Sequence, residues 1–288
     1  MTEMATGRDT SESADSRLTC VFWNANRRDR GDLVARLAAE KHADIVVLAE
    51  HGADNETTLD ALRHGVDESF VEPPCVAPRL QVFARGETLS LRETYTDAAK
   101  RLTIRLLRYQ ETEFLFAAVH LPSKLNWDPS SQTTQASIMA EEIRKEEQRR
   151  GHRRTVLCGD LNMNPFEDGV VQAAGLHAMM TRATANARSR TVQEREYPFF
   201  YNPMWGFFGD RTEGPAGTHY YRHFGQLSYE WNILDQVLFR PEALPWFQGD
   251  VEIVTEIGDT DLRDANGRPN QEIGSDHFPI VFRLGPAG

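Results

Sequence analysis

Four apolar, strand-like runs of the sequence end in polar side chains whose types could do chemistry together. These side chains are Asn24 in VFWNAN, Glu50 in VVLAEH, His120 in FAAVHLPSK, and Asp160 and Asn162 in VLCGDLN. The carboxyl ends of parallel strands meet at one edge of a sheet, so parallel pairing would bring these side chains to a common rim. Carboxylates, amides and an imidazole at one rim could bind a cation and move a proton.

Two further apolar runs carry their polar residues at the start rather than at the end. Asp235 lies early in NILDQVLF, and Asp276 and His277 precede the apolar part of GSDHFPIVF. A strand that runs antiparallel to its neighbours brings its start to the edge where the neighbours end. The two sets therefore converge only if the sheets are mixed.

A divalent-metal site is the first kind of chemistry that this set could perform. Glu50, Asp276 and the amide oxygen of Asn24 are hard oxygen ligands, which suit Mg²⁺ or Mn²⁺ together with water and substrate phosphate oxygens. Each of them also has a structural interpretation, since Glu50 could be a solvated strand end and the SDH segment could cap a strand. The metal interpretation depends on their convergence at one rim.

Hydrolysis of a phosphoester is the reaction that the remaining residues favour. Asp160 could take a proton from an attacking water, and Asn162 could orient that water or the phosphate. His120 and His277 could donate hydrogen bonds to a phosphate that gains charge in the transition state. As structural alternatives, Asp and Asn after a strand are common turn formers, and His120 before Pro122 could be a cap.

The elements that must position these residues can be predicted from hydrophobic periodicity. Amphipathic helices are expected at 31–43 and 130–150, and the back-to-back strands between 80 and 120 favour antiparallel pairing. Many strands with few helices predict two sheets packed face to face with helices on the outer sides. Strands are expected at 18–23, 44–49, 80–85, 102–109, 113–120, 155–158, 233–239, 251–256 and 278–284.

The chain organisation predicted from these patterns is one domain at 18–288 after a disordered polar tail at 1–17. Residues 182–225 are expected to form a long loop region. Neither a signal peptide nor a membrane-spanning run is visible. Two of the three cysteines, Cys20 and Cys158, lie in apolar runs, which favours buried thiols, a reducing compartment and a cytoplasmic location.

The charge of the chain limits how it could meet a polyanion. With 32 Lys and Arg against 43 Asp and Glu, the formal net charge of the 288 residues is −11. A general electrostatic affinity for nucleic acid or for an acidic membrane is therefore excluded. A phosphate-rich substrate would therefore have to be bound by a metal ion or by local positive charge.

The motifs WNAN, LAE, VHLPS, GDLNMNP, LDQVLF and GSDHFPI stand in the order seen in the endonuclease/exonuclease/phosphatase superfamily. The sequence resembles that family from about Leu18 to Leu284. The resemblance implies an α/β fold, a four-layer α/β/β/α sandwich of two mixed, largely antiparallel sheets, and a divalent-metal phosphoesterase. It also implies Glu50 as the main metal ligand, with Asn24 beside it.

The resemblance further implies roles around the reacting phosphate. Asp160 would activate water, and Asn162 would orient it and contact the phosphate. His120 and His277 would stabilise charge, and Asp235 would pair with His277.

The sequence departs from the family pattern at three places. Ile233 stands where many members have Arg, two residues before the Asp that Asp235 matches. The segment QTTQ at 132–135 replaces an Arg-x-x-Gln pattern, and the aromatic segment Tyr197 to Phe208 matches no subfamily pattern.

The favoured substrate class is nucleic acid. Arg27 and Arg28 follow Asn24 directly and are expected at the rim as phosphate contacts, whereas the cluster at 149–154 is expected at the opposite end. The aromatic segment could stack bases or could form a packed loop. The alternatives are a phosphatase or phosphodiesterase for inositol phosphates, phospholipids or another small phosphoester, and a binding module without activity. The sequence does not predict the oligomeric state.

Overall fold

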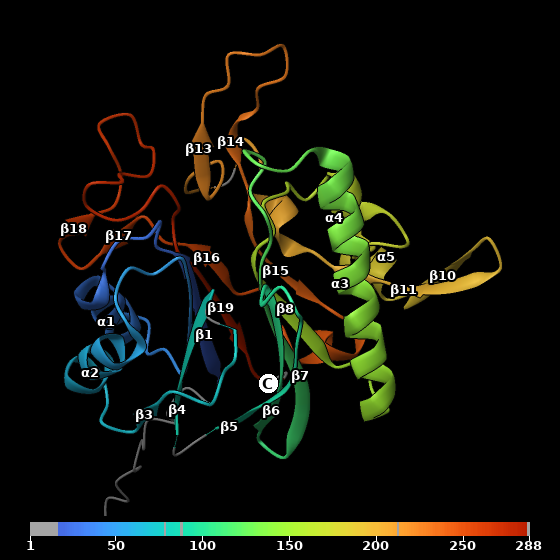
Figure 1. Ribbon diagram of the computed structural model, residues 1–288, viewed down its shortest axis with the longest axis horizontal. Coiled ribbons are helices and arrows are strands. Elements are labelled where there is room, and N and C mark those ends of the chain that lie inside the picture. The colour runs from blue at the N-terminus through green and yellow to red at the C-terminus, as the bar shows by residue number, and fades with distance from the viewer. Residues whose placement is uncertain (1–16, 78, 87–88, 212, 287–288) are drawn as a thin grey trace, which may run out of the picture.

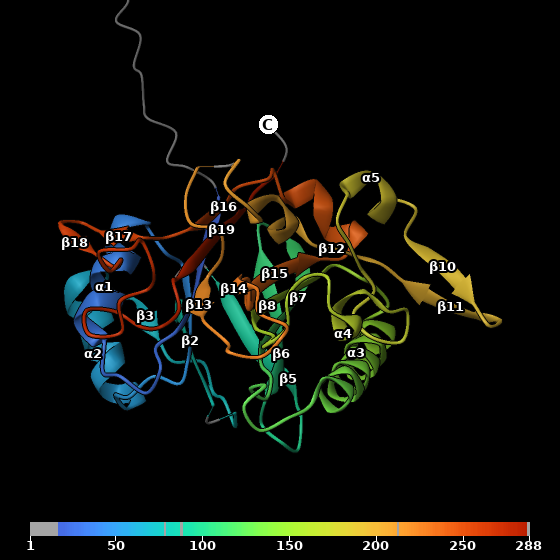
Figure 2. The same cartoon turned by 90° about the horizontal axis from the view of Figure 1, so that it is seen from above.

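Two β-sheets pack face to face, and helices cover their outer sides (Figure 1). The computed structural model describes residues 17–77, 79–86, 89–211 and 213–286, so all but the last residue of the predicted tail at 1–17 lies outside the described residues. The four layers are seen edge-on from above (Figure 2). The predicted α/β fold class is confirmed.

The first sheet has six strands in the order β16-β19-β1-β2-β4-β3. Its two central strands, β1 and β2, are parallel, and β19 pairs antiparallel with β1. The bounds are β1 Leu18–Asn24, β2 Ile45–Ala49, β3 Phe70–Val71, β4 Leu80–Arg85, β16 Val251–Ile253 and β19 Ile280–Leu284.

The second sheet has seven strands in the order β5-β6-β7-β8-β15-β12-β9. Strands β7 and β8 are parallel, while β5, β6 and β7 pair antiparallel. The antiparallel pairing of the strands predicted at 102–109 and 113–120 is confirmed, but β5 was not predicted, and the strand predicted at 80–85 lies in the other sheet. The bounds are β5 Ser90–Thr96, β6 Leu102–Tyr109, β7 Thr112–His120, β8 Thr155–Asp160, β9 Ala178–Met179, β12 Phe200–Tyr201 and β15 Asp235–Phe239.

The apolar residues of each strand divide between two cores because successive side chains point to opposite faces. In β7, Phe116 and Ala118 belong to the core between the sheets, whereas Ala117 and Val119 pack toward α3 (Pro129–Arg150). On the other outer side, α1 (Gly31–Glu40) and α2 (Asn55–Gly65) cover the six-stranded sheet.

Helix α3 begins and ends where its sequence specifies. The Asp128 carboxylate accepts a hydrogen bond from the backbone N–H of Ser131 at 2.8 Å, and Pro129 occupies the first turn. The helix ends at Gly151, whose φ of 70° is a left-handed cap. This helix carries the chain from the rim that holds His120 back to the start of β8.

The mixed topology brings the predicted strand ends to one rim. Parallel pairing sets the end of β1 beside that of β2 and the end of β7 beside that of β8. Strand β15 runs antiparallel to β8, so Asp235 lies opposite Asp160 in the register. Gly159, with a φ of 147°, permits the close approach of β8 to β7, because a Cβ there would lie 2.0 Å from the carbonyl oxygen of Val119.

The structure corrects the expectation of a long loop at 182–225. This region holds short elements, whose polar and aromatic residues give little periodic signal. They and the remaining short elements are α4 Asp168–Val171, α5 Arg182–Ala185, β10 Ser189–Val192, β11 Arg195–Pro198, η1 Pro203–Phe207, β13 His219–Tyr221, β14 Glu230–Asn232, η2 Pro241–Trp246, β17 Glu256–Ile257 and β18 Thr260–Asp261. The strand predicted at 251–256 is split between β16 and β17, and the strand predicted at 278–284 begins at Ile280.

Candidate active site

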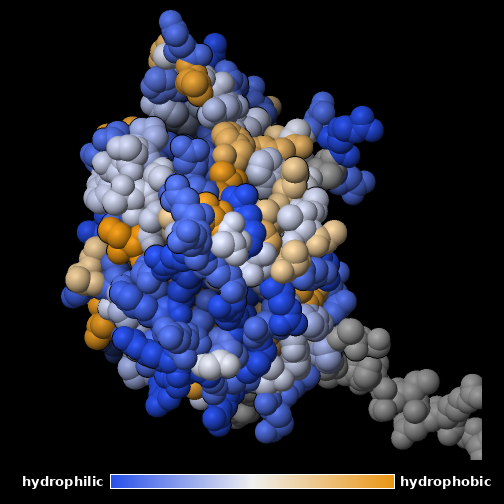
Figure 3. Space-filling view, turned by 90° about the vertical axis from the view of Figure 1, so that its right-hand side faces the viewer, coloured by the Kyte–Doolittle hydropathy of each residue, from blue (hydrophilic) through white to orange (hydrophobic). Residues whose placement is uncertain are grey.

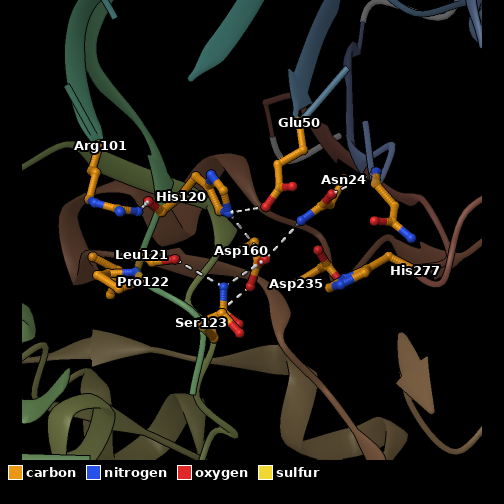
Figure 4. A network of polar contacts seen from close by, with 12 residues as sticks. Asn24, Glu50, Arg101, His120, Leu121, Pro122, Ser123, Asp160, Asp235 and His277 are labelled. Atoms are coloured by element: carbon orange, nitrogen blue, oxygen red, sulfur yellow. Dashed lines mark hydrogen bonds and ion pairs between the residues drawn. The ribbon is translucent and has the colours of Figure 1, made fainter. Parts of the chain in front are cut away.

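Asp160 lies at the centre of the rim and is only 1% exposed (Figure 4). The Asn24 side-chain amide donates to its Oδ2 at 3.0 Å. Asn162 donates to the same carboxylate twice, from its backbone N–H at 2.7 Å and from its side-chain Nδ2 at 2.9 Å. Two residues that the sequence placed on different strands therefore fix one carboxylate.

A second buried carboxylate, Asp235, lies directly across the sheet from Asp160. Its Oδ2 is 2.7 Å from Nδ1 of His277. Its other oxygen, Oδ1, has no hydrogen-bond partner among the described residues. Burial alone would lower the pKa of His277, but the charges of Asp235, Asp160 and Asp276 raise that pKa to about 10.

The negative charge of Asp235 acts on the facing carboxylate of Asp160. Burial, and next the negative charge of Asp235, raise the pKa of Asp160 to about 6, although His277 and His120 act in the opposite direction. A carboxyl group with such a pKa is well matched to accepting a proton near neutral pH.

Glu50 approaches from the other sheet. Its Oε1 is 3.1 Å from Nε2 of His120, and its Oε2 is 3.1 Å from Nε of Arg27. The hydrogen bond from His120 is the main cause that lowers the pKa of Glu50 to about 2. The same His120 nitrogen lies 3.8 Å from Oδ2 of Asp160, so one imidazole faces two carboxylates.

The backbone is strained at two of these positions. Glu50 has a φ of 47° and Asn162 a φ of 50°, in the left-handed region that residues other than glycine seldom adopt. Such strain costs about 1–3 kcal/mol at each residue and concentrates at functional sites.

Asp276 is held against β1 by its neighbours. The hydroxyl of Ser275 donates to the backbone carbonyl of Asn24 at 2.6 Å, and Nε1 of Trp23 donates to the carbonyl of His277 at 2.9 Å. The Asp276 carboxylate therefore lies beside the end of β1, although the two segments are about 250 residues apart in sequence.

His219 is a rim residue that the sequence did not reveal. It forms a bridge with His277, its ring centroid lies 4.6 Å from that of His277, and its Nε2 is 3.9 Å from Oδ2 of Asp276. Burial, and next the nearby His277, hold its pKa well below the usual range. The only signal was its place in the short segment THYY, which carries no motif.

The sequence of residues 21–277 matches the model of the endonuclease/exonuclease/phosphatase family. The chain belongs to this family. No curated protein matches the sequence, whereas many solved structures share its fold.

Three solved structures illustrate this likeness. Zebrafish TDP2 in complex with a single-strand DNA product is 16% identical, with a TM-score of 0.55 over 94% of this chain and 100% of the other. Human Nocturnin is 13% identical, with a TM-score of 0.56 over 94% of each chain. ANGEL2, described as a 2′,3′-cyclic phosphatase, is 12% identical, with a TM-score of 0.56 over 93% of this chain and 95% of that one. These likenesses show the fold.

Two of the departures from the family pattern, Gln132 and Ile233, form hydrogen bonds at the rim. Gln132, at the position of the usual arginine, is buried and donates to the carbonyls of Pro122 at 2.9 Å and Asn162 at 3.1 Å. Ile233 is also buried, and its backbone N–H donates to the side-chain oxygen of Asn164 at 2.9 Å. Both residues tie loops at the rim together.

The basic residues that follow Asn24 divide into different positions. Arg27 lies at the rim beside Glu50, and the side chain of Arg28 is exposed. Arg30 instead donates to the backbone carbonyls of Gly274 at 2.7 Å and Glu272 at 2.9 Å, and so holds the segment before Asp276. The cluster at 149–154 begins at the far end of α3, as expected (Figure 1).

The donor set at the rim fits a divalent cation. Asp160, Asp235 and Glu50 crowd negative charge into a small volume, and the buried Oδ1 of Asp235 lacks a partner among the described residues. The described residues include two groups whose possible ligand atoms lie within 4.8 Å of one another inside each group. These groups are Asp160–Asp235–His277 and His219–Asp276–His277. Neither group contains Glu50 or Asn24, and only Asp276 of the predicted metal ligands is in one of them. The carboxylate oxygens of the first group are hard ligands of the kind that suits Mg²⁺ or Mn²⁺.

Proposed function

We propose that this protein is a divalent-metal-dependent phosphodiester hydrolase, and specifically a nuclease. The observation that carries the proposal is the buried carboxylate of Asp160, which faces Asp235 and is fixed by Asn24 and Asn162. A turn former would be solvated, whereas this carboxylate is 1% exposed and its pKa is raised to about 6. It is therefore suited to act as a base at neutral pH.

Glu50, Asn24 and Asp276 are the residues we assign to the metal, with Mg²⁺ or Mn²⁺ as the ion. When bound, the ion supplies Lewis-acid polarisation of the phosphate and offsets its charge. The family is the support for metal use, together with the surplus of carboxylates at the rim. In the arrangement described here, Glu50 is paired with Arg27 and His120, and these pairs would loosen on metal binding.

Asp160 takes the proton from water in this proposal, while Asn162 orients that water. His277 carries a proton because Asp235 faces its Nδ1, and it donates a hydrogen bond to a non-bridging oxygen of the phosphate. His120 stabilises charge on the phosphate from the opposite side. Asp235 acts through His277 and is a positioning residue.

Nucleic acid is the substrate class that we favour. Structures with this fold include one described with a single-strand DNA product, although another is described as a cyclic phosphatase. Arg27 offers a positive contact for phosphate at the rim. Within the described residues, no helix has both the length and the apolar character to cross a membrane. The buried free thiols of Cys20 and Cys158 agree with a reducing, cytoplasmic location.

A substrate panel with Mg²⁺ or Mn²⁺ tests this proposal. The panel holds single- and double-stranded DNA, RNA, inositol phosphates and sphingomyelin, and compares the parent with Asp160→Asn. The exposed Asp259, changed to Asn, is the matched control. We expect cleavage of a nucleic acid by the parent and the control but not by Asp160→Asn. Hydrolysis of inositol phosphates or sphingomyelin alone would refute a nuclease, and no hydrolysis at all would favour a binding module.

A further inference from the structure

A hairpin formed by β13 and β14 projects above the rim (Figure 1). Its base is joined to the site on both strands. On one side Thr218 Oγ1 accepts a hydrogen bond from the backbone N–H of Asp235 at 3.2 Å, and His219 bridges to His277. On the other side the Asn164 amide donates to Asn232 at 2.8 Å. A ligand on this hairpin would therefore lie in a fixed relation to the catalytic residues.

Large apolar side chains of the hairpin are exposed to solvent. Phe224 is 95% exposed, Leu227 67%, Tyr229 53% and Tyr221 49%. In the space-filling view, apolar atoms stand at the top of the projection among polar ones (Figure 3). Exposed apolar groups gathered at one place commonly mark a binding surface.

A row of aromatic rings continues from the hairpin down to the catalytic loop. The Tyr229 ring lies 5.1 Å from that of Phe166, which lies 6.4 Å from Trp205 and 5.7 Å from Phe208. Phe166 follows the GDLNMNP motif that carries Asp160. The buried Nε1 of Trp205 has no hydrogen-bond partner among the described residues, so the row includes an unused donor.

Charge distinguishes the possible occupants of this surface. Apart from histidines, the segment 219–232 contains one basic residue, Arg222, and one acidic residue, Glu230. Nε of Arg222 lies 3.8 Å from Oε1 of Glu230. The hairpin therefore lacks the cluster of basic residues that would bind an anionic lipid surface. In a chain of net charge −11, contacts that need no charge would add to the limited affinity for a polyanion that metal or local positive charge provides.

We propose that the hairpin and the aromatic row form a base-stacking platform for single-stranded nucleic acid, whose phosphate lies at the Asp160 rim. This inference rests on the proposed nuclease function. Rings such as those of Phe224 and Tyr229 present faces on which unpaired bases stack, whereas the bases of a duplex already stack on each other. The polar residues Gln226 and Ser228 at the tip suit an aqueous polymer better than the interior of a lipid layer.

Substitutions at Phe224 separate stacking from general apolar contact. Phe224→Ala and Phe224→Leu both remove the ring, but Leu keeps an apolar side chain, and Phe224→Trp keeps a flat ring. Met180→Ala, at another exposed apolar residue, is the control. Binding of a labelled single-stranded oligodeoxyadenylate is measured in EDTA, beside an abasic oligomer with the same number of phosphates. Thermal unfolding checks the fold of each variant.

We expect Ala and Leu at 224 to weaken oligodeoxyadenylate binding by about 10-fold and to leave abasic binding unchanged, because a stacked base is lost. Trp at 224 and the Met180 control should bind like the parent. Hydrolysis of bis(p-nitrophenyl) phosphate, which has no base, should be equal in all variants. Unchanged oligomer binding in Phe224→Ala would overturn the platform, as would full affinity in Phe224→Leu.

Failure of the inference and failure of the proposed function give different results. If the parent cleaves the aryl phosphodiester and DNA but every Phe224 variant binds like the parent, the hydrolase stands and the platform falls. If the parent hydrolyses neither substrate, the proposed function itself falls. Binding to sphingomyelin vesicles that is lost in Phe224→Ala and kept in Phe224→Leu would replace the platform by a lipid-contacting tip.

Discussion

Strand β8 carries buried polar residues at both of its ends, and the two ends differ in how charge is matched. At its start, Thr155 donates to Glu147 at 2.7 Å, and Arg240 donates to the same Glu147 oxygen at 2.8 Å. Arg240 also donates to the carbonyl of Pro198 at 2.9 Å and lies 3.8 Å from the Phe200 ring centre. One cation meets one anion there.

Around the end of β8 the described residues include more carboxylates than cations, although His277 faces Asp235 and Arg27 faces Glu50. Asp160 faces a second carboxylate, Asp235, and Glu50 lies on the far side of His120. The start of the strand is a network that stabilises the fold by itself, whereas the end keeps a surplus of negative charge, which in our proposal a metal ion and a proton offset. Buried charge occurs at both ends of β8, so burial alone does not indicate a catalytic site. A surplus of buried carboxylates is the feature that indicates one.

A substitution at Asp160 should give the largest effect at the end of β8. Asp160→Asn keeps the shape of the side chain but removes the proposed base, so we expect turnover to fall by about 10²–10⁴-fold or more. The fold should survive, since the amide can still be held at the rim. Steady-state kinetics and thermal unfolding check both points; a variant that unfolds at working temperature would show that the carboxylate is structural.

The same comparison predicts the opposite outcome at the start of the strand. Arg240→Met leaves Glu147 buried without its partner, which should cost about 3–5 kcal/mol in the free energy of unfolding. Turnover of the folded protein should stay unchanged. Denaturant titration measures the loss, and a second substitution, Glu147→Leu, should recover much of it. A variant with normal stability and impaired turnover would contradict the distinction between the two ends.

Asp235→Asn tests whether the Asp235 carboxylate keeps His277 protonated. Without the anion the imidazolium of His277 loses its stabiliser, so its pKa, about 10 in the parent, should fall toward the usual value of 6.5. We expect turnover to drop by about 10²-fold, with little change in substrate binding. Histidine NMR titration and kinetics give the two readouts. Identical titration curves in parent and variant would mean that the pair does not interact.

The pair also predicts a pH dependence of stability. Because the folded pKa of His277 lies above its ordinary value of 6.5, the stabilisation is fully present below that pH and is lost as pH rises through about 10. The difference in unfolding free energy between the parent and Asp235→Asn should therefore be largest near pH 6 and shrink toward pH 10. A difference that grows with pH would reverse the assigned sign.

Glu50→Gln should give the smallest of these effects. One ligand charge is lost, so the metal concentration for half-maximal activity should rise by roughly 10-fold or more, while activity at saturating metal is partly restored. Metal titrations of the parent, the variant and a control, Glu56→Gln on the exposed face of α2, provide the test. Equal titrations would remove Glu50 from the metal site.

The sequence predicted the rim because polar residues interrupt long apolar runs at their ends, and strand direction then sets where those ends lie. It did not predict His219 or the hairpin, since strands of three residues with mixed polarity leave no periodic signal. Contacts such as Arg30 with the carbonyl of Gly274 join residues far apart in the chain. They depend on packing of the whole fold, and no local pattern encodes them.

The central claim is that the unmatched carboxylates serve a metal-dependent hydrolysis, and removal of divalent ions tests it most directly. The parent is assayed on DNA and on bis(p-nitrophenyl) phosphate in EDTA, and then with Mg²⁺ or Mn²⁺ added in excess. We expect no hydrolysis in EDTA and its return with either ion, because hard oxygen ligands select these cations. Full hydrolysis in EDTA would contradict it.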